Sequence, residues 1–321
     1  MRARRFDADR EDRILSLEEA LTARPSQRQL LWIDITGEIG REEAERLADG
    51  FSLDARTRRS LEVTGEDPSI AIHGEYFRVR LAAEPGDMEP GQTPWLEIVA
   101  GRNVVISRHL VPLQLLSDFD DRIEADATLG ELSSATFVAS LLDAVITSYH
   151  HAVDAIEDEV DALDAKSLKD DGRDPLPDLV ALRRRIARLR RLLTDHRSLF
   201  ASLASPDIAA FSGDPDGAAA LRAVTARFEG AIAAVEDSRE VLLGSFDVYM
   251  TRTAQRTNEV MKVLALATVL LLPGSLVAGL LGMNVTVPLS KDDPTSFWIV
   301  ALGVAAFAIA IVVVARARRW L

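Results

Sequence analysis

Polar and small residues recur along one side of an apolar stretch near the C-terminus of the chain. If this stretch is helical, one stripe of residues alternates three and four apart: Asn258, Met261, Ala265, Thr268, Leu272, Ser275, Gly279 and Gly282. Polar groups on one face of an apolar helix either pack against another helix or line a water-filled path. The available chemistry is therefore hydrogen bonding, to a neighbouring helix or to water.

The sequence offers little for covalent or metal-centred catalysis. It has no cysteine, which excludes disulfides, thiolate metal sites and a cysteine nucleophile. Its five histidines lack the spacing of a zinc enzyme, and we expect surface or structural roles for His73, His109, His150, His151 and His196. No G-x-x-x-x-G-K-[ST] motif is present, so the sequence shows no ATPase signature. The sequence predicts a protein that is not an enzyme and needs no cofactor.

Two long uncharged runs would hold the stripe in a membrane. They are Val263–Leu281 and Phe297–Ala315, with 19 residues each. About 20 residues in a helix span the hydrocarbon core of a bilayer. A buried helix of a soluble protein would explain one such run, whereas two in tandem predict a transmembrane hairpin.

Basic residues at the ends of the runs predict the orientation of this hairpin. Three precede the first run and three follow the second: Arg252, Arg256, Lys262, Arg316, Arg318 and Arg319. The loop between the runs holds one Lys and two Asp. The positive-inside rule therefore places both termini in the cytoplasm. The N-terminal segment MRARRF lacks the apolar region of a signal peptide.

Charge divides the chain at residue 258. The whole chain has 37 Lys and Arg against 50 Asp and Glu, a net charge of −13. Residues 258–321 carry +2, so the part before them carries −15. An acidic body argues against a nucleic-acid partner, which needs a basic surface. It would instead raise the local concentration of cations.

The part before residue 258 reads as a small α/β domain followed by long helices. Leu30–Ile35 predicts a buried strand, and Ser69–Ala82 and Trp95–Ser107 are rich in strand-forming residues. The cytoplasmic part is predicted to hold an α/β domain over 1–125 and a helical hairpin over 126–217. A long helix over 218–281, which includes the first span 263–281, leads into an extracytoplasmic loop over 282–296, a second span over 297–315 and a basic cytoplasmic tail over 316–321.

The predicted helices are unusually long. Leu132–Lys166 predicts a helix of about 35 residues, and 218–281 meets no proline until Pro273 and predicts one helix of about 64 residues. Between them, Leu179–Leu203 is basic and amphipathic. Its arginines either form a solvated face that pairs with the acidic segment Ile156–Ala165, or contact lipid or DNA.

Several motifs resemble the CorA family of divalent-cation channels. The chain reads Gly282-Met283-Asn284 at the outer end of the first span, where the family has its Gly-Met-Asn signature. Further similar segments cover most of the chain: 258–264 (NEVMKVL), Pro273, the terminus 316–321 (RARRWL), 246–249 (FDVY), the acidic helix around 157–164 and the Leu-x-x-Arg pattern of 182–193.

The resemblance implies a homopentamer in the bilayer of a bacterial inner membrane, with a funnel-shaped cytoplasmic domain and a pore lined by the first span. Gly282, Met283 and Asn284 would form the selectivity filter, where Asn284 offers a ring of amide carbonyls to a hydrated cation. The resemblance also implies polar positions along the pore, at Asn258, Thr268, Ser275 and Gly279. Met261, Leu264 and Leu272 would form a hydrophobic gate, and the Asp247 carboxylate would bind metal at the cytoplasmic throat.

The implied cargo is Mg²⁺, with Co²⁺ or Ni²⁺ as further ions. The family also contains a zinc-transporting, ZntB-like branch with the same fold, which is one alternative. Another is a non-conducting, membrane-tethered sensor or scaffold, because Ala223 and nearby small residues stand where the family often has acids that bind regulatory metal.

Overall fold

The computed structural model describes residues 1–9, 12–63, 65, 67–84, 93–124, 133–168, 174–208, 214–283 and 294–318. The chain divides into two compact units, Met1–Ser245 and Phe246–Leu321.

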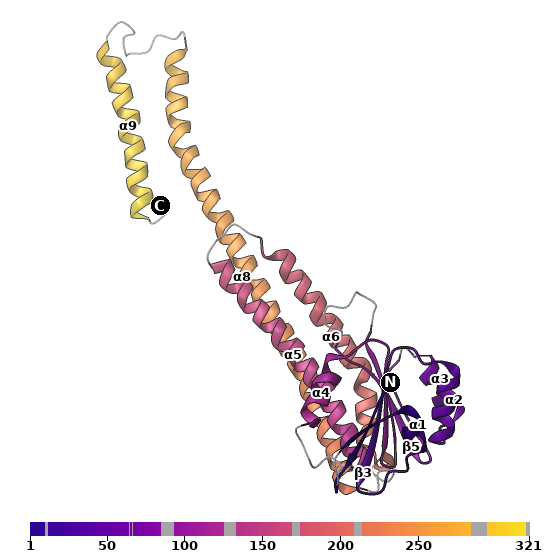
Figure 1. Cartoon of the computed structure of the whole chain (residues 1–321). Helices are drawn as coiled ribbons and strands as arrows, with labels where there is room; N and C mark the ends of the chain where they lie inside the picture. Colours follow the sequence, from indigo (N-terminus) through magenta and orange to yellow (C-terminus); the bar gives the residue numbers. More distant parts are fainter. Residues whose placement is uncertain are drawn as a thin grey trace. The chain divides into compact units, whose positions relative to one another are not determined.

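The N-terminal unit is built on a seven-stranded sheet with the strand order β2-β1-β3-β7-β6-β5-β4 (Figure 1). Only β3 and β7 are parallel neighbours; the other neighbouring pairs are antiparallel. The strands are β1 (Arg2–Asp7), β2 (Arg13–Leu15), β3 (Gln29–Thr36), β4 (Ser69–His73), β5 (Tyr76–Ala82), β6 (Trp95–Gly101) and β7 (Val104–His109). The predicted strand at 30–35 and the two predicted strand regions are confirmed, whereas β1 and β2 were not predicted.

Alternation along the strands gives the sheet two buried faces. One face packs against the short helices α1 (Leu17–Thr22) and α2 (Arg41–Gly50), through Leu31, Ile33, Ile35, Val99, Ile106, Ala20, Ala44 and Leu47. On the other face, the Trp32 ring lies 6.0 Å from Phe119 of α4 (Gln114–Glu124) and 5.5 Å from Phe137 of α5 (Ser134–Leu168). The sheet is therefore covered on both sides.

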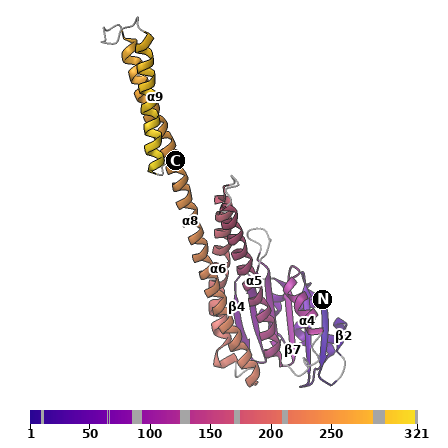
Figure 2. The ribbon, with the colours of Figure 1, turned by 90° about the vertical axis from the view of Figure 1, so that its left-hand side faces the viewer.

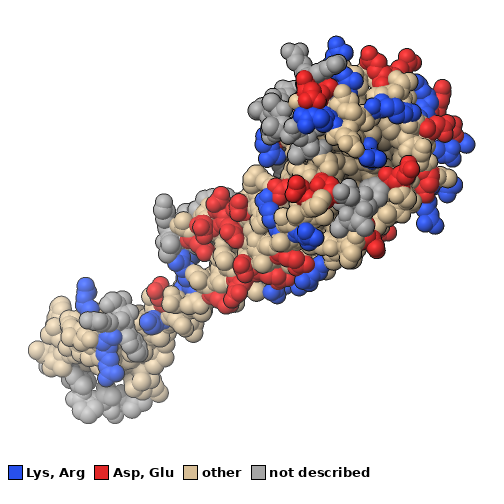
Figure 3. All heavy atoms as spheres, turned by 90° about the horizontal axis from the view of Figure 1, so that it is seen from below, with Lys and Arg blue, Asp and Glu red and all other residues tan. Residues whose placement is uncertain are grey.

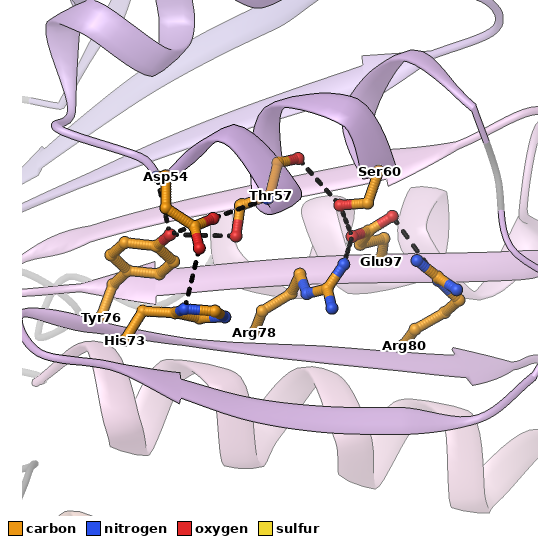
Figure 4. A network of polar contacts seen from close by, with 8 residues as sticks. All are labelled: Asp54, Thr57, Ser60, His73, Tyr76, Arg78, Arg80 and Glu97. Atoms are coloured by element: carbon orange, nitrogen blue, oxygen red, sulfur yellow. Dashed lines mark hydrogen bonds and ion pairs between the residues drawn. The ribbon is translucent and has the colours of Figure 1, made fainter.

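A buried carboxylate holds the helix α3 (Ala55–Glu62) on the sheet (Figure 4). Glu97 of β6 is 1% exposed, and Ser60 of α3 donates a hydrogen bond of 2.5 Å to it. The same carboxylate accepts a hydrogen bond of 3.3 Å from Arg78 and lies 3.7 Å from Nε of Arg80. Two guanidinium groups under α3 thus share this one carboxylate.

The start of α3 is fixed by a second set of polar contacts (Figure 4). Asp54 caps the helix by accepting a hydrogen bond of 2.7 Å from the Thr57 amide, and its carboxylate also lies 3.2 Å from Nδ1 of His73. The Tyr76 hydroxyl lies within 3.0 Å of side-chain oxygens of both Asp54 and Thr57. His73, on β4, therefore has a structural role.

Three long helices complete the unit. They are α5 (Ser134–Leu168), α6 (Leu176–Leu203) and α8 (Pro215–Gly282), and α8 continues beyond Ser245 into the second unit. Figures 1 and 2 show α5, α6 and the first part of α8 side by side. The expected helix over 132–166 is confirmed with a shift of two residues, and the expected unbroken helix over 218–281 is confirmed as a helix of 68 residues.

Serine–carboxylate pairs join α5 to α8. Ser238 donates a hydrogen bond of 2.5 Å to Glu157, and Ser245 donates one of 2.9 Å to Asp164. Both partners advance by seven residues together, so the two helices run parallel here. The two serines are 2% and 5% exposed. Among the described residues, each serine contacts one carboxylate across this buried seam and one backbone carbonyl of its own helix.

Arginines of α6 pair with acids of both neighbouring helices. Arg185 donates a hydrogen bond of 2.8 Å to Glu159 of α5. On α8, Glu229 accepts from Arg197 at 2.9 Å and Glu236 accepts from Arg190. The expectation that this basic helix pairs with the acidic helix is confirmed for Arg185, and α8 supplies further acidic partners that the sequence did not reveal.

Two buried side chains tie the end of β5 to the helices. The Ala82 amide donates a hydrogen bond of 2.7 Å to Nε2 of His196 on α6, and the Tyr149 hydroxyl of α5 donates to the Ala82 carbonyl. Nδ1 of His196 lies 2.6 Å from the Leu192 carbonyl, so the neutral ring both donates and accepts. The structural role expected for His196 is confirmed.

We expect His196 to make the N-terminal unit less stable in mild acid. Burial lowers the pKa of His196, outweighing the raising effects of the Leu192 carbonyl and Asp195. The native ring stays neutral where the unfolded ring, with a pKa of about 6.5, takes up a proton. The contribution of the neutral ring to the free energy of unfolding is present above about pH 6.5. It is lost as the pH falls towards the pKa of the native state, at up to about 1.4 kcal/mol per pH unit.

The measurement is the thermal unfolding midpoint of the full chain in detergent between pH 7.5 and 5. The decline on acidification should be shallower in His196→Gln than in the unsubstituted chain, and unchanged in His151→Gln, which alters an exposed histidine. Comparison with a variant is needed because the pKa of His109 is raised, which gives an opposite pH dependence. Burial lowers the pKa of His109, but Asp34 and the Val111 carbonyl together outweigh that effect. Equal slopes in all three proteins would contradict the prediction.

Candidate functional site

The second unit, Phe246–Leu321, contains the remainder of α8 and the helix α9 (Pro294–Ala317). Both helices are long and apolar enough to cross a membrane. Their most apolar 18-residue windows have a mean hydropathy of 2.3 in α8 and 2.9 in α9. These helices contain the two uncharged runs, so the structure supplies the two candidate spans that the sequence predicts.

One face of α8 packs against α9 within this unit. Six residues of the span are half-buried and recur three or four apart: Leu266, Leu270, Pro273, Gly274, Val277 and Leu281. Half-buried residues of α9 show matching spacing: Val300, Ala301, Val304, Ala308, Ile311 and Val312. A Cβ added at Gly274 would lie 3.5 Å from Cγ1 of Val304, which is ordinary van der Waals contact. The two helices are therefore in contact along these residues.

The predicted stripe lies on the opposite face of α8. At 100° per residue, Thr268 is about 200° from both Leu266 and Leu270, and Ser275 is about 200° from Val277. All eight residues of the stripe, from Asn258 to Gly282, are exposed. In this unit α9 thus covers only part of the apolar face, while Val269 and Leu276 stay exposed, and it leaves the stripe free. The helix α9 is therefore not the one against which the stripe packs.

A hydroxyl on the exposed face is oriented by the helix itself. Thr268 donates its hydrogen to the Leu264 carbonyl at 2.8 Å. Its oxygen lone pairs remain available as acceptors. The water molecules around a cation present their hydrogens outward, so a side chain held in this way suits a hydrated cation.

The residues of the Gly-Met-Asn motif fall at the end of α8. Gly282 is the last residue of the helix, and the Met283 amide donates a hydrogen bond of 3.4 Å to the Leu280 carbonyl. Met283 is 54% exposed. Asn284 lies outside the described residues, so the geometry of the amide ring expected there stays a prediction.

The remaining predicted positions are also on α8 and are exposed in the single chain. Met261, Leu264 and Leu272 are 58%, 59% and 61% exposed, as expected of apolar side chains that a single chain leaves uncovered. Asp247 is exposed near the start of the second unit. Among the residues that the structure describes, no group of three or more His, Asp or Glu side chains is arranged to hold a metal ion.

Sequence reasoning missed which apolar residues of α8 face α9. Leu266, Leu270 and Val277 do so, but by type they resemble the leucines and valines elsewhere on the helix. The only available signal was the small residue Gly274 amid large ones. The polar stripe was easier to find because its residue types differ from those around it.

Comparison with known proteins identifies the family of the chain. Residues 27–316 match the family model described as CorA-like Mg2+ transporter protein. The chain is 30% identical over 264 residues to the divalent cation transporter CmaX of Pseudomonas aeruginosa, covering 79% of this chain and 75% of that protein. It is 22% identical over 315 residues to the cobalt/magnesium transport protein CorA of Thermotoga maritima, covering 97% and 89%.

A solved structure shares the fold. The CorA magnesium transporter from Methanocaldococcus jannaschii superposes with a TM-score of 0.77 at 19% identity, covering 100% of this chain and 99% of that one. Its likeness confirms the predicted fold class of an N-terminal α/β domain followed by long helices and two C-terminal candidate spans. With a family model matched over most of its length, the chain belongs to the CorA-like Mg2+ transporter family.

Proposed function

We propose that the chain forms a homopentameric channel that imports divalent cations passively, with Mg²⁺ as the main ion. Members of its family are ion transporters and not enzymes. The observation that carries the proposal is the exposed stripe on α8, which α9 leaves free. Polar side chains such as Thr268 and Ser275 gain nothing from facing lipid, but they can line a water-filled path once further copies surround it.

The proposed filter matches the coordination chemistry of Mg²⁺. This ion demands octahedral geometry and gives up its water reluctantly. Neutral carbonyls, such as an Asn284 ring, accept hydrogen bonds from the hydration shell without replacing it. Binding of this kind is weak enough for the ion to leave, which conduction requires.

The driving force would be the membrane potential. At 100 mV, inside negative, a divalent ion gains about 4.6 kcal/mol on entering. We place the protein in the bacterial inner membrane with both termini in the cytoplasm, so that the acidic N-terminal unit meets the incoming ion. The net charge of −15 on residues 1–257 would concentrate cations there.

The test is ion flux into liposomes that contain the purified full chain, with an imposed potential and no nucleotide. We expect Mg²⁺ entry that grows with the potential, and smaller entry of Co²⁺ and Ni²⁺. Faster Zn²⁺ than Mg²⁺ flux would favour the zinc transporter instead. If none of these ions enters although native mass spectrometry finds pentamers, the sensor or scaffold would replace the proposed channel.

Truncation of the proposed gate should make the channel leak. Met261→Ala and Leu272→Ala remove apolar side chains that would close the pore by excluding water. We expect a severalfold rise in Mg²⁺ leak in the liposome assay under conditions that close the unsubstituted channel. Val269→Ala, on the apolar part of the same helix, is the matched control and should not change the leak. Equal leak in all variants would remove Met261 and Leu272 from the gate.

A further inference from the structure

The exposed face of α6 carries a stripe of arginines. Arg184, Arg188 and Arg191 are spaced four and three apart, so they lie on one face, and all three are exposed. This arginine stripe is distinct from the residues that pair with α5 and α8, which are Arg185, Arg190 and Arg197. Within the described part of the chain, the stripe residues form no ion pair.

An aspartate stripe with the same spacing runs along α5. Asp154, Asp158 and Asp161 are also four and three apart and exposed. They too have no ion-pair partner among the described residues. Figure 3 shows one face of the molecule, on which acidic side chains form a band along the helical part with basic side chains beside them.

The two stripes lie at the same level along the bundle. Arg185 contacts Glu159, and both His196 and Tyr149 bond to Ala82, so α5 and α6 are antiparallel with a fixed register. If Arg185 and Glu159 are taken to lie at the same height along the bundle, each arginine of the arginine stripe lies within two residues of the height of an aspartate of the aspartate stripe. That offset is about 3 Å at most.

The stripes cannot satisfy each other within one chain. Arg188 is about 200° around α6 from the buried Ile186, and Asp158 is about 200° around α5 from the buried Ile156. Each stripe therefore points away from the core of its own bundle. Opposite charges of equal number, spacing and level are thus presented outward on two different helices.

We propose that the arginine stripe of one protomer docks on the aspartate stripe of the next copy of this chain. The inference rests on the homo-oligomer of the proposed function. Rotation about a ring axis that runs along the helices leaves the level of each residue unchanged. An arginine stripe therefore meets an aspartate stripe at matching height, in a head-to-tail contact that closes around the ring.

The contact specifies orientation more than affinity. Exposed ion pairs contribute about 0–1 kcal/mol each, so three of them do not hold an oligomer together. Like charges brought together are unfavourable, however, and two copies that present the same stripe to each other would repel. The stripes thus favour one direction around the ring over a two-fold contact.

Disulfide trapping tests the geometry directly, because the chain has no cysteine of its own. Two differently tagged chains, one with Arg188→Cys and one with Asp158→Cys, are produced together and oxidised in membranes. We expect disulfide dimers that carry both tags. Either variant produced alone should give at least tenfold less dimer, since the contact joins unlike faces.

Charge reversal on the flanking positions tests the electrostatics. Arg184→Glu with Arg191→Glu, added to the Arg188→Cys chain, should reduce the mixed dimer severalfold. Asp154→Arg with Asp161→Arg in the Asp158→Cys chain should restore it when both reversals are present. The matched control is Arg183→Glu with Arg222→Glu, which changes the same net charge at exposed positions off the stripe and should leave the yield unchanged.

Three results would overturn the inference. The first is a dimer yield from either cysteine variant produced alone that equals the yield of the mixed dimer. The second is no mixed dimer although native mass spectrometry shows an oligomer, which leaves the proposed function standing. The third is an arginine-stripe reversal that weakens binding to phosphatidylglycerol vesicles without changing the cross-link. Monomers alone in the native spectrum would contradict the homopentamer itself.

Discussion

Replacing Asn284 with alanine is expected to reduce Mg²⁺ flux at least tenfold while the oligomer persists. In the proposed filter each subunit contributes one amide carbonyl to the hydrated ion. A hydrogen bond that involves a charged group is worth about 1.5–3 kcal/mol, and a change of 1.4 kcal/mol alters a rate about tenfold. Because every subunit loses its carbonyl, the loss is expected to exceed that of one bond.

Flux in liposomes and native mass spectrometry on the same preparation separate conduction from assembly. Gly303→Ala is a matched control on α9, because a Cβ added there meets nothing within 4 Å. Gly303→Ala should change neither the Mg²⁺ flux nor the number of subunits in the oligomer. Unchanged flux in Asn284→Ala would remove Asn284 from the filter, and a loss of the oligomer would assign it an assembly role instead.

Glu97→Gln is expected to destabilise the N-terminal unit by about 3–5 kcal/mol, the typical effect of removing one partner from a buried ion pair. The substitution keeps the size of the side chain but removes its charge. Arg78 and Arg80, whose side chains are 12% and 11% exposed, would then lie under α3 without their shared counter-charge. Ser60, which ties α3 to the sheet, would lose an ionised acceptor.

The effect should appear as a lower thermal unfolding midpoint and as faster amide hydrogen exchange in α3 of the full chain. Glu42→Gln, at an exposed position of α2, removes the same charge and should change stability by no more than about 0.5 kcal/mol. If Glu97→Gln and Glu42→Gln had similar effects, the buried carboxylate would not be what holds α3.

The long helices could be predicted because their signals are local. A run without glycine or proline anticipated α5 within two residues, and the absence of proline before Pro273 anticipated α8 as one helix. The helix continues through Pro273, which agrees with the prediction of one continuous helix over 218–281.

The sheet was harder to predict because its edges depend on partners distant in sequence. Strand β1 reads RARRFD and carries no apolar alternation that would mark a strand, yet it pairs with β3 over six residues. Likewise, Glu97 stands out as a charge in an apolar strand. Its partners lie at positions 60, 78 and 80, and no spacing rule brings those together.

For the candidate site, periodicity identified the stripe on α8 but not what covers it. The structure adds that α9 lies on the other face, which a list of leucines and valines could not reveal. The filter position Asn284 rests on the motif alone, because it lies outside the described residues. The carboxylate assigned to the throat, Asp247, is likewise placed only as an exposed residue of α8.

The seam between α5 and α8 restricts how these helices can move past each other. A slide of one helical turn would leave Ser238 and Ser245 buried without either carboxylate. A slide of seven residues, about 10 Å, would bring Ser245 opposite Glu157, or Ser238 opposite Asp164 in the other direction, and recover one of the two present pairs. The seam therefore resists small axial translations of α8 along α5, and a conformational change of the bundle is expected to occur by tilting or bending with the register kept.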